Sequence, residues 1–399
     1  MTDLAAIRIL DASLNRATEG LRVVEDYVRF ALDDGHLTEQ FKRLRHDLAA
    51  VGAVLPLEER HAARDTRHDV GTGVTTPSEG RREDAWGVCV ASLERVKQSL
   101  RSLEEFAKVA SPRAAGAFEA LRYRLYTLEA AVGRTVDAME RLEGVYLYVL
   151  IDGCDSEGAF VELVEQLVAA GVDAIQLREK RLGDRELIER GRLLRKVLNE
   201  HHNTHAACGS LPLEGRAGEG VGSWYTLQSP LPSPPLQGEG TGNSSHGRAV
   251  LTSSPLCIIN DRPDVAAIVD ADGVHLGQDD MTVKDARAVV GTRKLIGVST
   301  HSIEQARAAV LDGANYLGVG PTFPSRTKEF AAFPGLALAR QVAAEIRLPA
   351  FAIGGVSADN LNEVLATGIS RVAVGSAIVA AASPESAAAE LRGVLPDTR

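Results

Sequence analysis

The residues best suited to chemistry stand where short apolar runs end. One run ends in Gln176, Arg178 and Lys180, which are alternate positions and point the same way on a strand. Another run ends in Asn260 and Asp261. If both runs are strands of one parallel barrel, these cations, amides and the carboxylate meet at the carboxyl ends of the strands, where such barrels carry their active sites.

Two further stretches add groups of the same kinds. Residues 275–280 read His-Leu-Gly-Gln-Asp-Asp, and residues 321–328 read Pro-Thr-Phe-Pro-Ser-Arg-Thr-Lys. Each group alone is typical of a solvated loop. Together they supply cations, carboxylates and hydroxyls at one rim. That donor set suits Mg²⁺ and a diphosphate, because Mg²⁺ binds through one or two carboxylates and bridges phosphate oxygens.

Glycines mark a second candidate site. The last two apolar runs end in Gly354-Gly355 and Gly375-Ser376. Glycine lets a backbone approach a ligand closely, and the loops after strands seven and eight of a (β/α)₈ barrel often bind phosphate. The alternative is a pair of tight turns. The pattern predicts two phosphorylated groups in the barrel, one bound with metal and one without.

The elements that must position these residues follow from the alternation of the chain. From Gly144 onward, short apolar runs alternate with amphipathic helical patterns, as expected for buried parallel strands. Eight such units favour a closed (β/α)₈ barrel, an α/β fold, over an open doubly wound sheet. The runs are residues 145–151, 173–179, 256–261, 273–277, 294–299, 314–320, 349–355 and 371–377.

Residues 202–254 break this alternation. They are rich in Gly, Pro and Ser and contain a crude repeat, LPLEGRAGEG and PPLQGEGTG. Such a composition cannot bury enough apolar surface to form a core. We therefore predict a disordered insertion after the second barrel helix, on the face opposite the carboxyl ends of the strands.

The residues that precede the barrel have a different hydrophobic pattern. From Leu4 to about Glu140 the apolar residues recur at helical spacing, as in Leu10, Leu14 and Leu21. Residues 59–83 are polar and contain several glycines, which predicts a long loop between two helical hairpins. We therefore divide the chain into an all-helical domain, 1–140, and a barrel domain, 141–399.

Composition excludes several classes of protein. The 399 residues carry a net charge of −10, which argues against nucleic acid or an anionic membrane as the main partner. No apolar stretch is long enough for a membrane span, and the first residues lack a signal-peptide pattern, so we expect a cytoplasmic protein. Four widely spaced cysteines favour reduced thiols over disulfides or structural zinc. The oligomeric state stays open, a homo-oligomer included.

Six ordered motifs resemble the thiamine phosphate synthase family. They are QLREK (176–180), IND (259–261), DGVHLGQDD (272–280), GVSTH (297–301), GVGPTFPSRTK (318–328) and AIGG (352–355). The resemblance extends from Gly144 to about Leu395, apart from the insertion. It implies a transferase that joins 4-amino-2-methyl-5-hydroxymethylpyrimidine diphosphate to 4-methyl-5-(2-phosphooxyethyl)thiazole. The products are thiamine phosphate and pyrophosphate.

The same resemblance implies roles for individual residues. The metal ion is Mg²⁺, and its ligands are Asp261 and Asp280. Gln176 faces the aminopyrimidine. The diphosphate is held by Arg178, Lys180, Asn260 and Lys328, with Ser299 beside the departing group. Ser325, Thr327, Gly355, Gly375 and Ser376 surround the thiazole phosphate. The catalytic residues are then Arg178, Lys180, Ser299 and Lys328.

The implied chemistry explains what the sequence lacks. In the family, the diphosphate leaves first to give a pyrimidine methyl cation, which the thiazole nitrogen then attacks. This route needs charge neutralisation and positioning but little proton transfer. No Ser-His-Asp triad is evident or required. We accordingly assign His275 and His301 to packing or loop hydrogen bonds.

The function of the helical domain is less clearly indicated by its residues. The domain resembles, over about residues 4–130, an extension suspected of phosphorylating hydroxymethylpyrimidine monophosphate in some members of the family. The loop from Arg64 to Asp69 mixes acids and bases as a phosphate-handling site does, whereas salt-bridged helix faces and a polar loop are the structural alternative. A sequence pattern for a nucleotide-binding Walker loop is absent.

Two other functions compete with the synthase. A thiazole tautomerase of the same barrel family shares the phosphate cradle, and a non-enzymatic thiamine-related binding protein needs only part of the site. Neither needs Arg178, Lys180 and Lys328 together with the two carboxylates of Asp261 and Asp280. The complete diphosphate set therefore favours the synthase.

Overall fold

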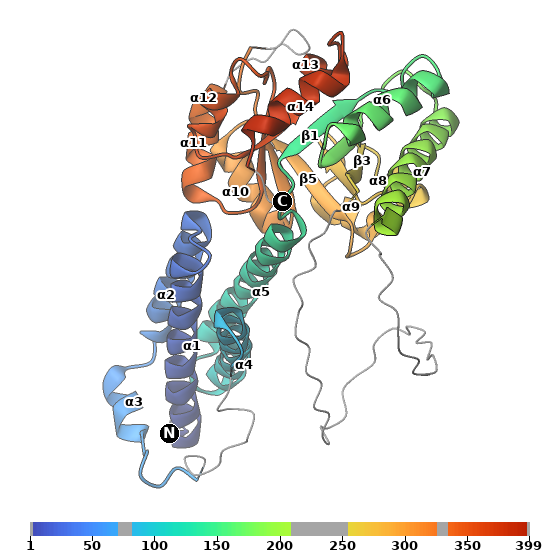
Figure 1. Ribbon diagram of the computed structural model, residues 1–399. Coiled ribbons are helices and arrows are strands. Elements are labelled where there is room, and N and C mark those ends of the chain that lie inside the picture. Colours follow the sequence, from blue (N-terminus) through green and yellow to red (C-terminus); the bar gives the residue numbers. More distant parts are fainter. Residues whose placement is uncertain (1–2, 71–81, 209–253, 325–333, 397–399) are drawn as a thin grey trace, which may run out of the picture.

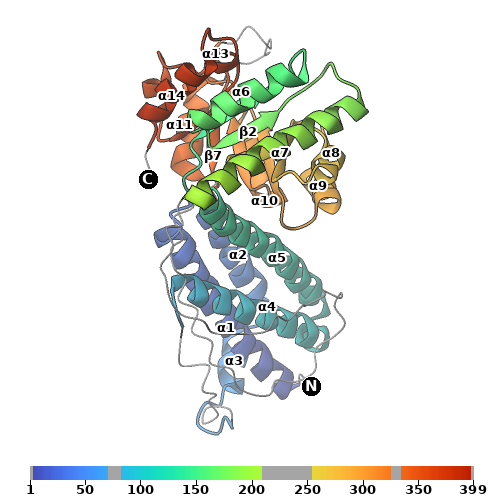
Figure 2. The same ribbon diagram turned by 45° about the vertical axis from the view of Figure 1, so that its right-hand side comes forward.

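The computed structural model describes residues 3–70, 82–208, 254–324 and 334–396. Figures 1 and 2 show two parts, a bundle of long helices and a barrel of strands surrounded by shorter helices. The predicted fold, a (β/α)₈ barrel preceded by an all-helical region, is confirmed.

The bundle contains α1 (Leu4–Phe30), α2 (Gly35–Gly52), α3 (Leu57–Ala63), α4 (Ala85–Ala110) and α5 (Pro112–Arg141). Three of these helices begin after an aspartate whose side chain accepts a backbone N–H of the first turn; these caps are Asp3, Asp34 and Asp84. The apolar stripes of the helices, spaced by three and four residues, meet in a common core.

The predicted loop over residues 59–83 is wrong at its start, because α3 continues to Ala63. Pro56 precedes this helix, and Glu58 and Glu59 occupy its first turn, where acidic side chains favour a helix N-terminus. Residues 71–81 of the predicted loop lie outside the described residues.

Eight parallel strands close the barrel in sequence order. They are β1 (Leu147–Ile151), β2 (Ala174–Leu177), β3 (Leu256–Asn260), β4 (Gly273–Leu276), β5 (Leu295–Thr300), β6 (Tyr316–Val319), β7 (Ala350–Ile353) and β8 (Arg371–Val374). Seven of these strands lie within the apolar runs, and β5 extends one residue beyond its run, to Thr300. Because nearly all strand residues are buried, the runs are mainly apolar, with polar residues near their ends.

The helices around the barrel are α6 (Glu157–Ala169), α7 (Asp184–Cys208), α8 (Pro263–Ile268), α9 (Val283–Val290), α10 (Ile303–Asp312), α11 (Gly335–Glu345), α12 (Leu361–Leu365), α13 (Ser376–Val379) and α14 (Pro384–Val394). Helix α7 enters the predicted insertion, so residues 202–208 are helical rather than irregular. The sequence has no glycine or proline between Gly191 and Gly209 to end the helix earlier. The remainder of the predicted insertion, 209–253, lies outside the described residues.

Aromatic side chains fill the barrel interior. Tyr148, Tyr316 and Phe351 lie edge to face with ring centroids 5.4–6.0 Å apart. A Cβ atom on Gly297 would lie 2.1 Å from the ring of Tyr316, so only glycine leaves room for that ring. Leu142, which follows α5, belongs to the same interior cluster. The core of the barrel is therefore solid below the mouth.

The bundle docks on the amino end of the barrel. Between α11 and β7, the N–H of Arg347 donates to the Asp34 carboxylate at 2.8 Å, and its guanidinium pairs with Asp33. A Cβ atom on Gly313, which follows α10, would lie 3.4 Å from Nε of Arg134 in α5. Both barrel segments lead into the amino ends of strands. The bundle therefore lies opposite the mouth, as the two views agree (Figures 1 and 2).

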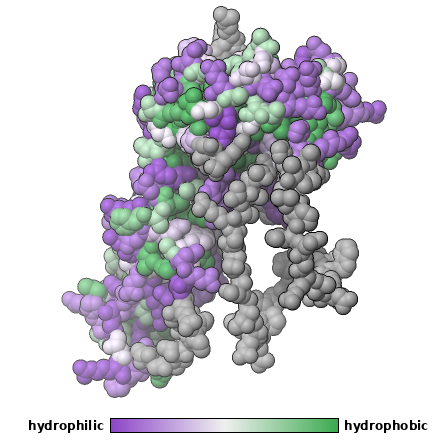
Figure 3. All heavy atoms as spheres, in the orientation of Figure 1, coloured by the Kyte–Doolittle hydropathy of each residue, from purple (hydrophilic) through white to green (hydrophobic). Residues whose placement is uncertain are grey.

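The outer surface is mostly polar. Hydrophilic residues predominate on the face drawn in Figure 3. Among the described residues, no helix combines the length and the apolar character that crossing a membrane requires.

Candidate active site at the barrel mouth

Strand register brings the predicted polar residues to one layer of the barrel. Asn260 is paired with His275, and His275 is paired with Gly297. Gln176 on β2 is buried, and its Nε2 donates to Oδ1 of Asn260 at 2.5 Å. The inward positions of neighbouring strands thus meet just below the mouth, as alternation along the strands predicts.

Two carboxylates face each other above this layer. Asp261 follows β3 with a φ of +60°, and its N–H donates to the carbonyl oxygen of His275 at 2.8 Å. Asp280 accepts the N–H of Gly277 at 2.6 Å. Burial, and then the adjacent Asp280 carboxyl, raise the pKa of Asp261 to about 6. Nearby Lys180 and Arg178 oppose this rise, so both cations lie close to the carboxylate pair.

The loop after β2 is held by a residue that our sequence interpretation missed. The Glu179 carboxylate accepts the N–H groups of Gly153 at 2.8 Å, Lys180 at 2.7 Å and Arg181. Burial opposes ionisation of Glu179, but these hydrogen bonds prevail and lower its pKa to about 2. Glu179 therefore joins the loop after β2 to the loop after β1, while Arg178 is half-buried and Lys180 is exposed at the rim.

Ser299 lies at the mouth end of β5, above a buried chain of hydrogen-bonding groups. Its Oγ is 2.9 Å from Nε2 of His275, and Nδ1 of His275 is 3.3 Å from the hydroxyl of Tyr316. The Tyr316 hydroxyl is 3.1 Å from that of Tyr148. Burial lowers the pKa of His275 to about 4, so its ring is neutral near pH 7. The expectation that His275 makes packing and hydrogen-bond contacts is confirmed.

His301 also makes the predicted loop contact. Its Nδ1 lies 2.6 Å from the carbonyl oxygen of Gly320, and its N–H donates to Oε1 of Gln305 at 2.7 Å. The first contact joins the end of β5 to the end of β6, and the second joins it to α10.

Glycines follow both β7 and β8. Gly354 and Gly355 have φ values of +94° and +68°, and a Cβ atom on either would lie 2.8 Å from Pro321 or Phe323. Both positions therefore require glycine, because of the left-handed backbone and because a Cβ atom would collide with its neighbour. Gly375 is half-buried, and Ser376, which begins α13, is exposed. Ser325, Thr327 and Lys328 lie outside the described residues.

The donor set at the mouth fits Mg²⁺ better than a zinc-like ion. In the described ranges, no group of three or more His, Cys, Asp or Glu side chains could hold a metal ion. Asp261 and Asp280 provide two carboxylates, whose proximity opposes ionisation of Asp261. Mg²⁺ commonly takes one or two carboxylates and completes its shell with water and phosphate oxygens.

The charged loop of the bundle is engaged in internal contacts. Arg64 donates two hydrogen bonds, of 2.7 and 2.8 Å, to the buried carboxylate of Asp11. Arg8 donates to the carbonyl oxygen of Asp65 at 2.6 Å, and the Asp65 carboxylate contacts His68. These contacts fasten the loop to α1, in agreement with the structural alternative for Arg64 and Asp65.

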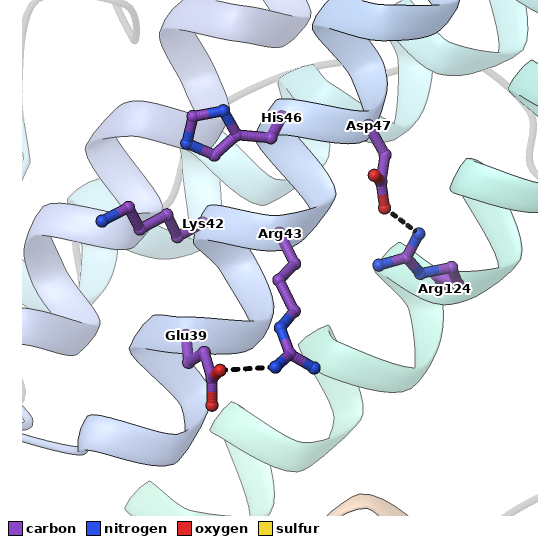
Figure 4. Close-up of a pocket in the computed structure, with 6 residues that line it drawn as sticks. All are labelled: Glu39, Lys42, Arg43, His46, Asp47 and Arg124. Atoms are coloured by element: carbon purple, nitrogen blue, oxygen red, sulfur yellow. Dashed lines mark hydrogen bonds and ion pairs between the residues drawn. The ribbon is translucent and has the colours of Figure 1, made fainter.

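Other charges of the bundle are also paired. Buried Glu25 and Glu104 each contact two arginines, which are Arg22 and Arg45 for the first and Arg101 and Arg122 for the second. Figure 4 shows an open hollow between α2 and α5, in which Glu39 pairs with Arg43 and Asp47 pairs with Arg124. This hollow gives no reason to assign a ligand.

Comparisons with known proteins found matches to both parts of the chain. A family model described as thiamine monophosphate synthase matches residues 147–205 and 250–378, and one described as the ThiD2 family matches residues 8–131. Among solved structures, thiamine phosphate pyrophosphorylase from Pyrococcus furiosus is 30% identical, with a TM-score of 0.45, covering 62% of this chain and 94% of that one.

Curated relatives match along nearly the whole chain. Thiamine-phosphate synthase of Rhodopirellula baltica is 38% identical over 382 residues, covering 93% of this chain and 88% of the relative. Thiamine-phosphate synthase of Gloeobacter violaceus is 37% identical over 379 residues, covering 95% and 93%. With relatives of this similarity spanning both the bundle and the barrel, the chain belongs to the thiamine-phosphate synthase family.

Proposed function

We infer that the barrel is a thiamine-phosphate synthase, a transferase that joins the hydroxymethylpyrimidine diphosphate to the thiazole phosphate and releases pyrophosphate. The observation that carries this inference is the pair of facing carboxylates, Asp261 and Asp280, close to Arg178 and Lys180. The family membership of the chain supports the same reaction.

Departure of the diphosphate needs positive charge near its oxygens. We propose that Arg178 and Lys180 bind the diphosphate from the β2 side, with Lys328 approaching from the segment after β6. The Glu179 contacts support this role, because they fix the backbone between the two cations before substrate binds. A preorganised site spends little free energy on reorientation during the reaction.

The two adjacent carboxylates support a Mg²⁺ site, because Mg²⁺ commonly binds one or two carboxylates. Asp261 and Asp280 would hold the ion beside the diphosphate. Bound there, Mg²⁺ supplies charge that neutralises the leaving group.

The pyrimidine ring needs an acceptor for its exocyclic amine. We propose that Gln176 takes this role. Its Nε2 is committed to Asn260, so its carbonyl oxygen remains to accept a hydrogen bond from the ring. Because Gln176 is buried, this bond forms away from bulk water, where it is worth more.

The thiazole phosphate needs donors that carry no metal. We propose that Gly355, Gly375 and Ser376 bind it together with Ser325 and Thr327. The left-handed backbone at Gly355 supports this proposal, because a side chain there would collide with Phe323.

The direct test is turnover by the purified chain. Both substrates and Mg²⁺ are added, and thiamine phosphate and pyrophosphate are measured by chromatography. We expect equal amounts of both products and loss of activity in excess chelator. A rearranged thiazole without coupling would instead identify a tautomerase, and binding without any conversion would identify a binding protein.

We propose a second activity for the bundle, phosphorylation of the pyrimidine monophosphate, because residues 8–131 match a separate family model. A purely structural bundle is the alternative. The test uses full-length Asp261→Asn, in which the barrel cannot consume the diphosphate. With ATP, Mg²⁺ and the monophosphate, diphosphate should accumulate. A folded variant that neither binds the monophosphate in calorimetry nor forms diphosphate would leave the bundle a structural role.

These substrates are small molecules, and we propose that the enzyme works in the cytoplasm without a nucleic-acid or membrane partner. The acidic net charge of −10 supports this proposal, since it disfavours polyanionic surfaces.

A further inference from the structure

Below Ser299 lies a buried series of hydrogen-bonding groups in which the direction of each hydrogen bond can be assigned. It joins the hydroxyls of Tyr148 and Tyr316, the imidazole of His275 and the Ser299 hydroxyl, with successive contacts of 3.1, 3.3 and 2.9 Å. Tyr148 and Tyr316 are each 2% exposed, so bulk solvent does not reach their hydroxyl groups. A neutral imidazole has one N–H donor and one acceptor nitrogen. Each link can therefore run in only one of two directions.

The inner end of the chain selects the direction. In the part of the chain that the structure describes, the Tyr148 hydroxyl has no hydrogen-bond partner except Tyr316. If Tyr316 donated to Tyr148, the hydrogen of Tyr148 would have no acceptor. If Tyr148 and His275 both donated to the oxygen of Tyr316, the hydroxyl hydrogen of Tyr316 would have no acceptor. A buried hydroxyl hydrogen without an acceptor is strongly unfavourable.

The remaining arrangement runs outward from the core. Tyr148 donates to Tyr316, Tyr316 donates to Nδ1 of His275, and the Nε2–H of His275 donates to Oγ of Ser299. Ser299 then accepts from below, so its own hydrogen must point elsewhere. Oγ has no other hydrogen-bond partner among the described residues. Since Ser299 is half-buried at the mouth end of β5, the barrel mouth is the side left open to this hydrogen.

We propose that His275 and Tyr316 are positioning residues that turn Ser299 into a hydrogen-bond donor aimed at the departing diphosphate. This inference rests on the proposed synthase function. The diphosphate gains negative charge as its bond to the pyrimidine carbon breaks, so a donor fixed in advance stabilises the transition state more than the ground state. No proton is transferred, because Ser299 only shares its hydrogen with the leaving oxygen.

The packing supports a fixed geometry for this chain. A Cβ atom on Gly297 would lie 2.1 Å from the Tyr316 ring, and one on Gly318 would lie 3.0 Å from Cε1 of His275. Two glycines thus leave space for the two rings, whose centroids are 5.5 Å apart. The backbone carbonyl of Ser299 is also bound, by Nε2 of Gln278 at 2.5 Å.

The first experiment measures where the hydrogen lies. Full-length protein with ¹⁵N-labelled histidine is studied by NMR without substrate, and the His275 signals are assigned by their absence from His275→Gln. We expect the hydrogen on Nε2. A hydrogen on Nδ1 would overturn the proposal, whatever the turnover of the enzyme.

The second experiment compares two substitutions of similar size. His275→Gln keeps an N–H that can donate to Ser299, whereas His275→Met does not. We expect kcat to fall about tenfold or more in the Met variant, with KM within about twofold, and to stay within about threefold of the wild type in the Gln variant. Equal kcat values for the two variants would mean that His275 only fills space, and would contradict the proposal.

A double-substitution cycle tests whether His275 acts through Ser299. Ser299→Ala removes the donor, so adding His275→Met to it should lower kcat by less than about twofold further. Independent, multiplying losses would refute positioning. If the wild type formed no thiamine phosphate, the proposed synthase function would fail, while the position of the hydrogen would still be measured.

Discussion

Replacing Asp261 by asparagine should separate the metal site from the stability of the barrel. Asp261 has a φ of +60°, a left-handed conformation that asparagine adopts more readily than most residues. Asp261→Asn therefore removes the charge with little backbone strain. Asp261→Ala removes the same charge but adds about 1–2 kcal/mol of strain, so the pair of variants distinguishes the two effects.

The size of the effect follows from the pKa of Asp261. Burial and the Asp280 carboxyl raise it from 3.8 to about 6. At about 1.4 kcal/mol per pKa unit this is about 3 kcal/mol, which we reduce to about 1–2 kcal/mol because the group is partly solvated. The folded chain holds this proton more tightly than the unfolded chain. The contribution of this proton to the free energy of unfolding is therefore fully present below the unfolded pKa of 3.8 and is lost as pH rises through the folded pKa of about 6.

The assay is calorimetric unfolding of Mg²⁺-free protein. Well above pH 6, Asp261→Asn should melt a few degrees above the wild type, at about 2–4 °C per kcal/mol, and the advantage should vanish near pH 4. Turnover should fall at least about a hundredfold, because the Mg²⁺ that would neutralise the leaving group loses one of its ligands. A variant no more stable than the wild type at both pH values would show that the two carboxylates do not oppose each other.

Three further substitutions and one deletion test other parts of the chain. Asp34→Asn keeps the helix cap but places an amide against the N–H of Arg347, which should weaken docking of the bundle on the barrel by about 1–3 kcal/mol. Calorimetry should then show the unfolding transitions of the bundle and the barrel at more widely separated temperatures, with turnover unchanged. Gly297→Ala should lower the melting temperature of the barrel because its Cβ would overlap the Tyr316 ring, whereas Gly116→Ala, which meets nothing within 4 Å, should raise that of the bundle slightly. Deleting residues 205–252 should leave activity and melting temperature nearly unchanged, and insoluble protein would contradict this.

The sequence was sufficient for the barrel because each strand is a short apolar run with a sharp end. Alternation along β2 and into the residue that follows it places Gln176 and Arg178 on the same face, and register then brings Asn260 within 2.5 Å of Gln176. Such placement needs only the period of a strand and the sequential order of a closed sheet.

Other features depend on closure of the fold, which no local pattern contains. Tyr148 and Tyr316 are 168 positions apart and meet only when β1 and β6 lie across the same barrel. Glu179 stood in a recognised motif, but its use as an acceptor for three backbone N–H groups depends on the loop conformation. The pairing of Asp34 with Arg347 likewise joins two segments whose charges look solvated in the sequence.

Docking of the bundle on the amino end of the barrel bears on metabolic coupling. The bundle contacts the segments that lead into β6 and β7, whereas Asp261 and Ser299 lie at the opposite ends of their strands. If the bundle makes the pyrimidine diphosphate, as we propose, this product has to diffuse around the barrel and mix with the free pool before it reaches the mouth. Joining the two domains in one polypeptide fixes their ratio at one to one, and we expect no channelling of the intermediate. An added enzyme that consumes the diphosphate should therefore compete efficiently for it.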